Sequence, residues 1–205
     1  MRGFDSARTL TSDTCRPFSK GRSGFALGEG AGVLVLETLR DATRRGAPIL
    51  AELAGFGMST DAVDAVQPTR RGPVAAMTRT LADACLSGDA VGYINAHGTG
   101  TQLNDEVETA AMHEVFGAHA GRLVMSSTKS QIGHALGAAG ALELIATVLG
   151  LRHGIAPPTM NHLGPDPACD IDCAPNEARD LRFNAAVSQS FAFGGLNAAV
   201  AIRAV

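Results

Sequence analysis

Apolar and polar residues alternate along this chain in two periods, one typical of strands and the other typical of helices. Short runs rich in β-branched residues predict strands at 33–36, 49–58, 91–94, 123–126, 185–191 and 197–202. Apolar residues spaced three or four apart predict helices at 39–45, 73–86, 104–116 and 135–151. Strands that alternate with helices, and then two strands joined by an FAFGG turn, indicate a mixed α/β sheet covered by helices.

The predicted helix at 135–151 is unusually rich in small residues near its start. Ala138, Ala139, Gly140 and Ala141 permit close helix packing, so we expect this helix to be buried. His134 then lies at its amino end, where the helix dipole disfavours imidazolium. A neutral ring there can donate an N–H to a developing oxyanion.

A second histidine stands in the stretch VGYINAHGTGT at 91–101. His97 follows a predicted strand on a glycine-rich loop, and Glu106 and Glu108 favour the first turn of the next helix. Open α/β sheets place their chemistry at the carboxyl ends of strands. Taken alone, this loop fits a buried structural histidine and a functional one equally well.

Glycines crowd the stretch just before the first predicted strand, at Gly24, Gly28, Gly30 and Gly32. The sequence GEGAG is similar to a dinucleotide-binding loop, but that fingerprint requires a strand before it and a helix after it. Here a strand follows at 33–36, so the cofactor interpretation fails. Glycines that let one backbone approach another beside a buried strand explain the cluster better.

Composition narrows the class of protein. The 205 residues are 45% apolar and 18% charged, which is typical of a globular domain with a substantial core. No uninterrupted apolar run is long enough to span a bilayer, and no basic-then-apolar leader starts at Met1, so we expect a cytoplasmic protein. A net charge of −3 argues against nucleic acid as the main partner.

The cysteines are scattered, at Cys15, Cys85, Cys169 and Cys173, which favours reduced thiols over a disulfide framework. Cys169, Cys173 and His162 could be imagined as zinc ligands. A single C-x3-C spacing without a second ligand pair is a weak signal, so no metal site is predicted.

Four motifs together carry a family resemblance. These are CRPFSKGRSGFALGEGAGVLVLE (15–37), INAHGTGT (94–101), SSTKSQIGHALGAAGALE (126–143) and SQSFAFGGLNA (188–198). In this order and at about this spacing, they resemble the carboxyl-terminal half of a β-ketoacyl-acyl-carrier-protein synthase of the thiolase-like superfamily. The resemblance covers nearly the whole chain.

The resemblance implies a reaction and a set of catalytic residues. In the family, a cysteine takes an acyl group, and the enolate of a decarboxylated malonyl unit attacks it to give a 3-ketoacyl product. His97 and His134 resemble the two donors to the enolate oxygen, and Lys129 resembles the lysine that orients the site. The backbone N–H of Phe193 resembles one member of the oxyanion hole, and its ring resembles the gate of the acyl pocket.

Further residues are implied in binding and support. Thr99 and Thr101 resemble hydroxyls that bind the pantetheine arm, although turn-stabilising hydroxyls would fit nearly as well. Phe4 resembles a residue near the acyl pocket, and Arg8 resembles one on the entrance loop, where a basic side chain would help an acidic carrier protein to dock. The remaining positions near the site are Glu143, Gly194 and Gly195. Glu143 matches a buried carboxylate near Lys129, and the alternative is that the two form a pair retained for folding.

The resemblance also implies an architecture. We expect a thiolase-like half-fold, with residues 1–23 as an entrance loop and connection and residues 24–205 as the carboxyl-terminal ketosynthase domain. A complete unit would have five layers, αβαβα, of which this chain supplies one half. Half of such a fold leaves apolar surface uncovered, so the chain alone should give little soluble monomer.

The nucleophilic cysteine is missing from the matched positions, since the family carries it in the amino-terminal half. We therefore expect the chain to be inert until a cysteine-bearing half or subunit joins it, in an assembly that is dimeric in complete units. No covalent cofactor is implied, and the phosphopantetheine arm of the carrier protein enters as substrate. The alternatives are a non-catalytic partner, like the chain-length factors, and a truncated remnant with only a binding role.

Two smaller departures from the family lie in the FAFGGL stretch. Ala192 and Leu196 stand where glycine and threonine are usual in the family. Both alter the gating turn, and they put substrate fit in question while leaving the reaction type unchanged.

Overall fold

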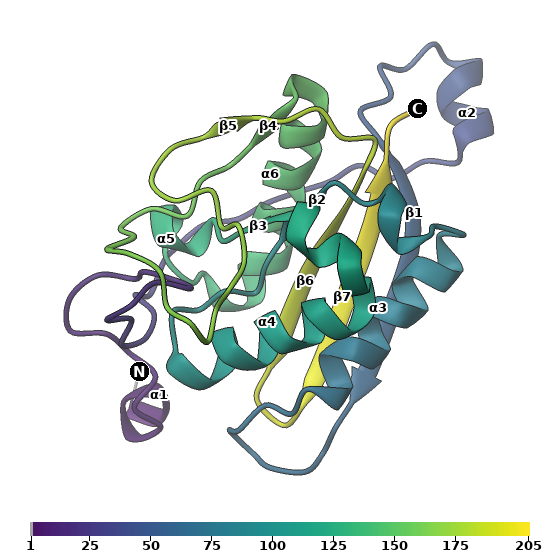
Figure 1. Ribbon diagram of the computed structural model, residues 1–205. Helices are drawn as coiled ribbons and strands as arrows, with labels where there is room; N and C mark the ends of the chain where they lie inside the picture. The colour runs from purple at the N-terminus through teal and green to yellow at the C-terminus, as the bar shows by residue number, and fades with distance from the viewer. Residues whose placement is uncertain (1) are drawn as a thin grey trace.

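A computed structural model describes residues 2–205, and its centre is a five-stranded mixed sheet (Figure 1). The strand order is β1-β7-β6-β2-β3. The strands are β1 (Glu52–Thr60), β2 (Tyr93–Asn95), β3 (Val124–Ser126), β6 (Ala185–Ala192) and β7 (Leu196–Arg203). β2 runs parallel to β3 and β6, whereas β7 is antiparallel to β6 and β1. The mixed α/β sheet and its terminal hairpin are thus confirmed.

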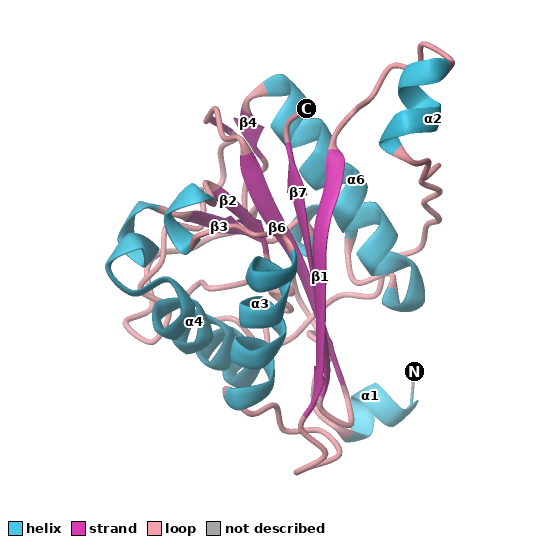
Figure 2. Cartoon of the chain, turned by 90° about the vertical axis from the view of Figure 1, so that its right-hand side faces the viewer, coloured by secondary structure: helices cyan, strands magenta, loops and turns pink. Residues whose placement is uncertain are grey.

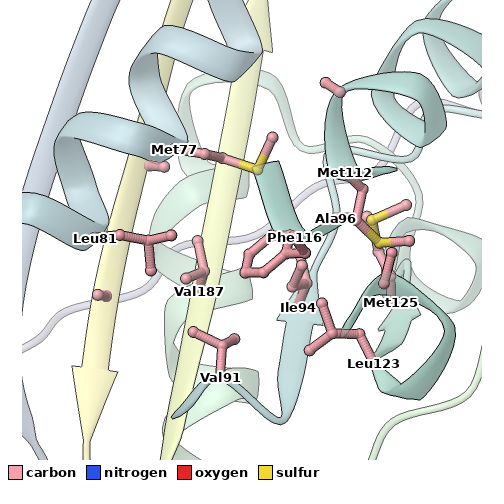
Figure 3. Packing of buried hydrophobic residues seen from close by; sticks show 14 of the residues in the cluster. Met77, Leu81, Val91, Ile94, Ala96, Met112, Phe116, Leu123, Met125 and Val187 are labelled. Atoms are coloured by element: carbon pink, nitrogen blue, oxygen red, sulfur yellow. The ribbon is translucent and has the colours of Figure 1, made fainter. Parts of the chain in front are cut away.

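Helices cover both faces of the sheet (Figure 2). α3 (Arg71–Asp83) packs on β1 and β7, and α4 (Gln102–Phe116) packs beside α3. α6 (Ala139–His153) lies on the opposite face, against β6 and β2. The main apolar core fills the space between the sheet and the α3–α4 layer, where Met77, Phe116 and Val187 meet (Figure 3).

Short elements complete the chain. The short α-helices are α1 (Arg2–Ser6), α2 (Leu39–Arg44) and α5 (Lys129–Ile132), and the 3-10 turns are η1 (Gly88–Ala90), η2 (Gly117–Arg122) and η3 (Leu136–Ala138). β4 (Ile155–Ala156) and β5 (Arg179–Asp180) form a separate two-stranded sheet, and the proline-rich segment between them, 157–178, is irregular. α2 begins as its sequence predicts, because the Thr38 hydroxyl accepts a hydrogen bond from the Asp41 amide (3.2 Å).

The predicted strand at 33–36 is wrong. The backbone there is irregular, and Val33 and Val35 are 86% and 82% exposed. In the part of the chain that the structure describes, no strand lies beside this segment to accept its hydrogen bonds. β-Branched residues favour a strand only when a neighbouring strand and a packing surface are present.

The predicted helix at 135–151 is also different in the structure. α6 begins at Ala139, after the separate 3-10 turn η3, and only one side of it is buried, at Ala139, Glu143, Thr147 and Gly150. The stretch Leu136–His153 is long and apolar enough to cross a membrane by length and composition alone. It also carries Glu143, a buried carboxylate that pairs with Lys129 on the neighbouring α5, as the core helix of a globular protein can.

The glycine cluster lets the chain cross the exposed side of α5 and α6. A Cβ on Gly28 would lie 2.1 Å from the Ile132 carbonyl oxygen, and one on Gly32 would lie 2.9 Å from the Ile145 side chain. The close approach of backbones is therefore present, although the surface that it meets is a helix layer and not a strand.

Candidate active site

His97 stands on a tight loop at the carboxyl end of β2. Gly98 (φ 39°) and Gly100 (φ 76°) adopt the left-handed conformation that this turn requires. A Cβ on Gly98 would also lie 2.5 Å from the Cβ of Ser127, so the loop tolerates no side chain there. The ring of His97 is nearly fully buried.

Two buried carboxylates of α4 hold this loop by its main-chain amides. Glu108 accepts hydrogen bonds from the amides of His97 (2.6 Å) and Gly98 (2.7 Å). Asp105 accepts from the amides of Gly100 (3.2 Å) and Phe18 (2.9 Å). Burial raises the pKa of Glu108 to about 7 and that of Asp105 to about 6, against the lowering effect of these donors.

Sequence reasoning missed this role of Glu108 and Asp105. It placed Glu106 and Glu108 at the favourable end of the helix dipole and gave Asp105 no role. The signal available was their spacing, because residues 105 and 108 lie on one face of a helix that starts where the histidine loop ends.

His134 reaches the same place from another part of the chain. A bridge with Leu27 positions it: the His134 amide donates to the Ala26 carbonyl (2.8 Å), and the Gly28 amide donates to the His134 carbonyl (3.0 Å). Its Nδ1 accepts from the Leu136 amide (3.2 Å), which places the proton of the neutral ring on Nε2.

The two imidazoles meet edge to face, with ring centroids 5.5 Å apart. Burial lowers the pKa of both rings, and the nearby Lys129 charge lowers it further. The pKa of His134 falls to about 4, so both rings are neutral at pH 7. The cause differs from the predicted one, because α6 begins five residues beyond His134 and burial, not a helix dipole, is responsible.

Lys129 on α5 and Glu143 on α6 form an ion pair with both side chains 1% exposed. Burial raises the pKa of Glu143, and the Lys129 ammonium opposes that rise. Glu143 thus holds the Lys129 ammonium in place, and the charge of Lys129 acts on both histidines.

A cavity of about 1,100 Å³ opens from the histidines toward the surface. The Thr99 and Thr101 hydroxyls line it and lie 2.9 Å apart, within hydrogen-bonding distance of each other. Phe4 and Arg8 also line it, and Arg8 has a left-handed backbone (φ 54°) that is unusual for arginine.

Phe193 stands in the β6–β7 turn, and its ring packs against Phe4 with centroids 5.6 Å apart. Gly194 and Gly195 have positive φ, as the turn demands. Two main-chain hydrogen bonds tie this turn to the loop after β1: the Gly194 amide donates to Ala65 (2.9 Å), and the Asp61 amide donates to Gly195 (2.8 Å). Sequence reasoning missed this second loop, since 129 positions separate Gly194 from Ala65 and 134 positions separate Gly195 from Asp61.

The four cysteines are free, and none lines the cavity. Burial raises the pKa of Cys15 to about 11 and that of Cys169 to about 12, so these thiols carry little thiolate at pH 7. Within residues 2–205, no group of three or more His, Cys, Asp or Glu side chains could hold a metal ion.

The cavity therefore offers two neutral N–H donors and a nearby cation, and no cysteine lines it. Such a constellation can stabilise a developing oxyanion but does not itself contain a nucleophile. Ser190 and Phe191 on β6 line the cavity on the sheet side, and the Phe191 ring lies 5.5 Å from that of His97.

Comparison with known proteins points to one family. Residues 50–162 match the model of the β-ketoacyl synthase C-terminal domain, and residues 1–42 match that of the N-terminal domain. The chain is 53% identical to nodulation protein E of Rhizobium leguminosarum bv. trifolii over its full length, and 46% identical over 99% of its length to 3-oxoacyl-acyl-carrier-protein synthase 2 of Coxiella burnetii. It spans about half the length of these curated relatives (51% of each).

Solved structures agree with this likeness. The ishigamide ketosynthase/chain length factor superposes on all of this chain with a TM-score of 0.96 and 41% identity, over 50% of its own length. A β-ketoacyl synthase from Burkholderia phymatum covers 99% of this chain with a TM-score of 0.95 and 40% identity, over 51% of its own length. The thiolase-like fold of ketosynthases is thus confirmed, and the chain belongs to the β-ketoacyl synthase family.

Proposed function

We propose that this chain supplies the two histidines and the lysine of a 3-ketoacyl synthase, and that a cysteine-bearing half completes the site. The reaction is the decarboxylating Claisen condensation of an acyl thioester with malonyl-acyl-carrier-protein, in fatty-acid or polyketide synthesis. One observation carries the proposal: two neutral imidazoles from distant segments lie 5.5 Å apart on one cavity.

The imidazoles of His97 and His134 act on the malonyl unit. When its C–C bond to the carboxylate breaks, CO2 leaves and the electron pair becomes an enolate. N–H groups of the neutral rings hydrogen-bond the enolate oxygen, where the charge develops. The enolate carbon then attacks the acyl carbonyl, and the cysteine of the other half leaves as thiolate.

Lys129 keeps both rings neutral during this cycle. Its buried positive charge, held by Glu143, disfavours imidazolium at His97 and His134. A protonated ring would also stabilise the malonyl carboxylate before CO2 leaves, and this would raise the barrier to decarboxylation. This is the orienting role proposed for Lys129.

The cavity wall binds the rest of the substrate. Thr99 and Thr101 present hydroxyls to the phosphopantetheine arm of the carrier protein, and Phe193 contributes its backbone N–H to the oxyanion hole and its ring to the acyl gate. Phe4 packs on Phe193 and borders the acyl group, whereas Arg8 faces the acidic carrier protein. Gly194 and Gly195 give the turn its shape.

The partners follow from this chemistry. They are a cysteine-bearing amino-terminal half and an acyl carrier protein, within a cytoplasmic assembly that is dimeric in complete units. A solved ketosynthase that is 35% identical to this chain is described in complex with its acyl-carrier protein. The second candidate, a chain-length-factor-like partner, would not need two neutral imidazoles on one cavity.

Reconstitution tests the proposal. The chain is co-expressed with a cysteine-bearing amino-terminal half from the same family, and formation of 3-ketoacyl-carrier-protein is measured. We expect activity only when both halves are present. His97→Ala should lower kcat by roughly 10²–10³, the loss typical of a removed oxyanion donor.

His113→Ala is the matched control. This histidine lies on α4 outside the cavity and pairs with Asp170 (2.9 Å), so its removal should leave condensation unchanged. Condensation that survives His97→Ala would contradict the catalytic proposal and favour the non-catalytic partner.

A further inference from the structure

Gln189 on β6 contacts the carboxylate that supports the His97 loop. Its Nε2 donates to Oε1 of Glu108 (2.8 Å), and both side chains are almost completely buried. Two residues further along the same strand, the Phe191 ring lies against the ring of His97. One strand therefore contacts the histidine ring directly and its main chain through Glu108.

Four hydrogen-bond donors contact Glu108, two at each oxygen, and together they use the lone-pair sites of a carboxylate. Oε1 accepts from His97 N and Gln189 Nε2, and Oε2 accepts from Gly98 N (2.7 Å) and Asn104 Nδ2 (3.3 Å). An ionised carboxylate accepts at both oxygens, whereas a protonated one must turn an O–H toward a donor. The four-donor arrangement thus requires the ionised form.

The orientation of the Gln189 amide follows from the same reasoning. Its Oε1 is buried and has no hydrogen-bond partner among the described residues. Turning the amide over would give that oxygen a contact with Glu108, but it would bring two acceptors together. A buried carbonyl left unpartnered costs free energy. The amide nevertheless keeps this orientation, because its hydrogen bond to Glu108 outweighs that cost.

We infer that Gln189 is a positioning residue, whose amide holds Glu108 in the acceptor state that fixes the main chain of His97 and Gly98. The inference rests on the proposed function only where it concerns catalysis. Without the amide, Glu108 would take up a proton at higher pH and release one of the loop amides. His97 would then lose its fixed position opposite His134.

Other charges around Glu108 shift its pKa in both directions. Asp105, one turn earlier on α4, raises its pKa, and Lys129 on α5 lowers it, while the nearby His97 ring is neutral. Burial is the largest effect and raises the pKa to about 7. Because this pKa lies near physiological pH, loss of one donor such as Gln189 changes the fraction of Glu108 that is ionised.

The test uses the chain assembled with the cysteine-bearing half. Labelling this chain with ¹³C-carbonyl histidine and ¹⁵N-glycine selects His–Gly peptide bonds, of which the sequence has two, His97–Gly98 and His153–Gly154. The Gly98 amide donates to Glu108 and reports its titration. The Gly154 amide, at the end of α6, reports the folded state.

The variants are Gln189→Met, which removes the donor at similar volume, and Gln189→Glu, which places a second carboxyl beside Glu108. The Gly98 midpoint, which is the pH at which the Gly98 amide signal is halfway through the titration of Glu108, should rise by about 1 pH unit in Gln189→Met. It should also rise in Gln189→Glu, because two carboxylates sharing a site repel. Gln131→Met, at an exposed glutamine that bonds the Pro158 carbonyl, should leave it unchanged.

The acid limb of condensation activity should move upward with the Gly98 midpoint. A shifted midpoint in an assembly without activity would contradict the proposed function and support the role of Gln189. A midpoint unchanged in both variants, or loss of the Gly154 signal in both, would overturn the inference, since Gln189 would then have only a structural role.

Discussion

At the residue scale, the most costly feature of the site is a buried ion pair beside two neutral rings. Taking the Lys129 ammonium and the Glu143 carboxylate out of water costs several kcal/mol per ion, and their mutual attraction offsets it only when both are present. The Lys129 charge also lowers the pKa of His97 and His134. The pair therefore connects stability with the neutral state of both rings, which the proposed mechanism requires.

Double substitution separates these two effects. Lys129→Met alone leaves a buried, uncompensated Glu143 and should lower the free energy of unfolding of the assembled protein by about 3–5 kcal/mol. Lys129→Met with Glu143→Met should cost less than either single change. Urea unfolding of all three variants measures this. Equal losses in the single and double variants would contradict an energetic pairing.

How far the sequence predicts the site also depends on individual residues. His97, His134, Lys129 and Glu143 were predicted from motifs, and the structure brings all four together. Gln189 was not, because its contact with Glu108 spans 81 positions and depends on strand register. Single-residue chemistry is visible in a sequence, but hydrogen bonds between distant elements are not.

At the element scale, the glycine-rich crossing (residues 24–32, which pass over α5 and α6) explains one correct and one wrong prediction from the sequence. Close backbone approach was predicted, and Gly28 lies against Ile132 and Gly133. The strand predicted after it at 33–36 is wrong, because local pattern cannot show whether a partner strand is present. The bridge between Leu27 and His134 shows that this crossing also positions His134, one of the two proposed donors to the enolate.

Gly28→Ala tests the link between the crossing and the site. The new Cβ would clash with the Ile132 carbonyl oxygen, so the backbone must move where the Gly28 amide bonds His134. A displacement of about 1 Å at His134 should lower kcat of the reconstituted enzyme by roughly 100-fold. Gly121→Ala, at a site with no heavy atom within 4 Å, is the control and should keep full activity.

At the scale of the whole molecule, apolar side chains remain uncovered around the glycine-rich crossing. Val33, Val35, Leu36 and Leu39 are all more than half exposed, and the segment that leads to α2 runs clear of the sheet (Figure 2). Exposed apolar residues so grouped indicate an interaction surface. They match the prediction that half of a thiolase-like fold leaves surface for a partner half.

Charge placed in this surface should weaken the assembly. Burying a valine contributes about 1.5–3 kcal/mol, so Val33→Asp with Val35→Asp should raise the Kd between the two halves by at least about 100-fold. Val205→Asp, at an equally apolar and 72% exposed position, should not change it. Sedimentation of the co-expressed halves over a dilution series measures the affinity.

The chain alone should elute as aggregate, because nothing then covers these side chains. A monodisperse monomer on a sizing column would show that this surface needs no partner.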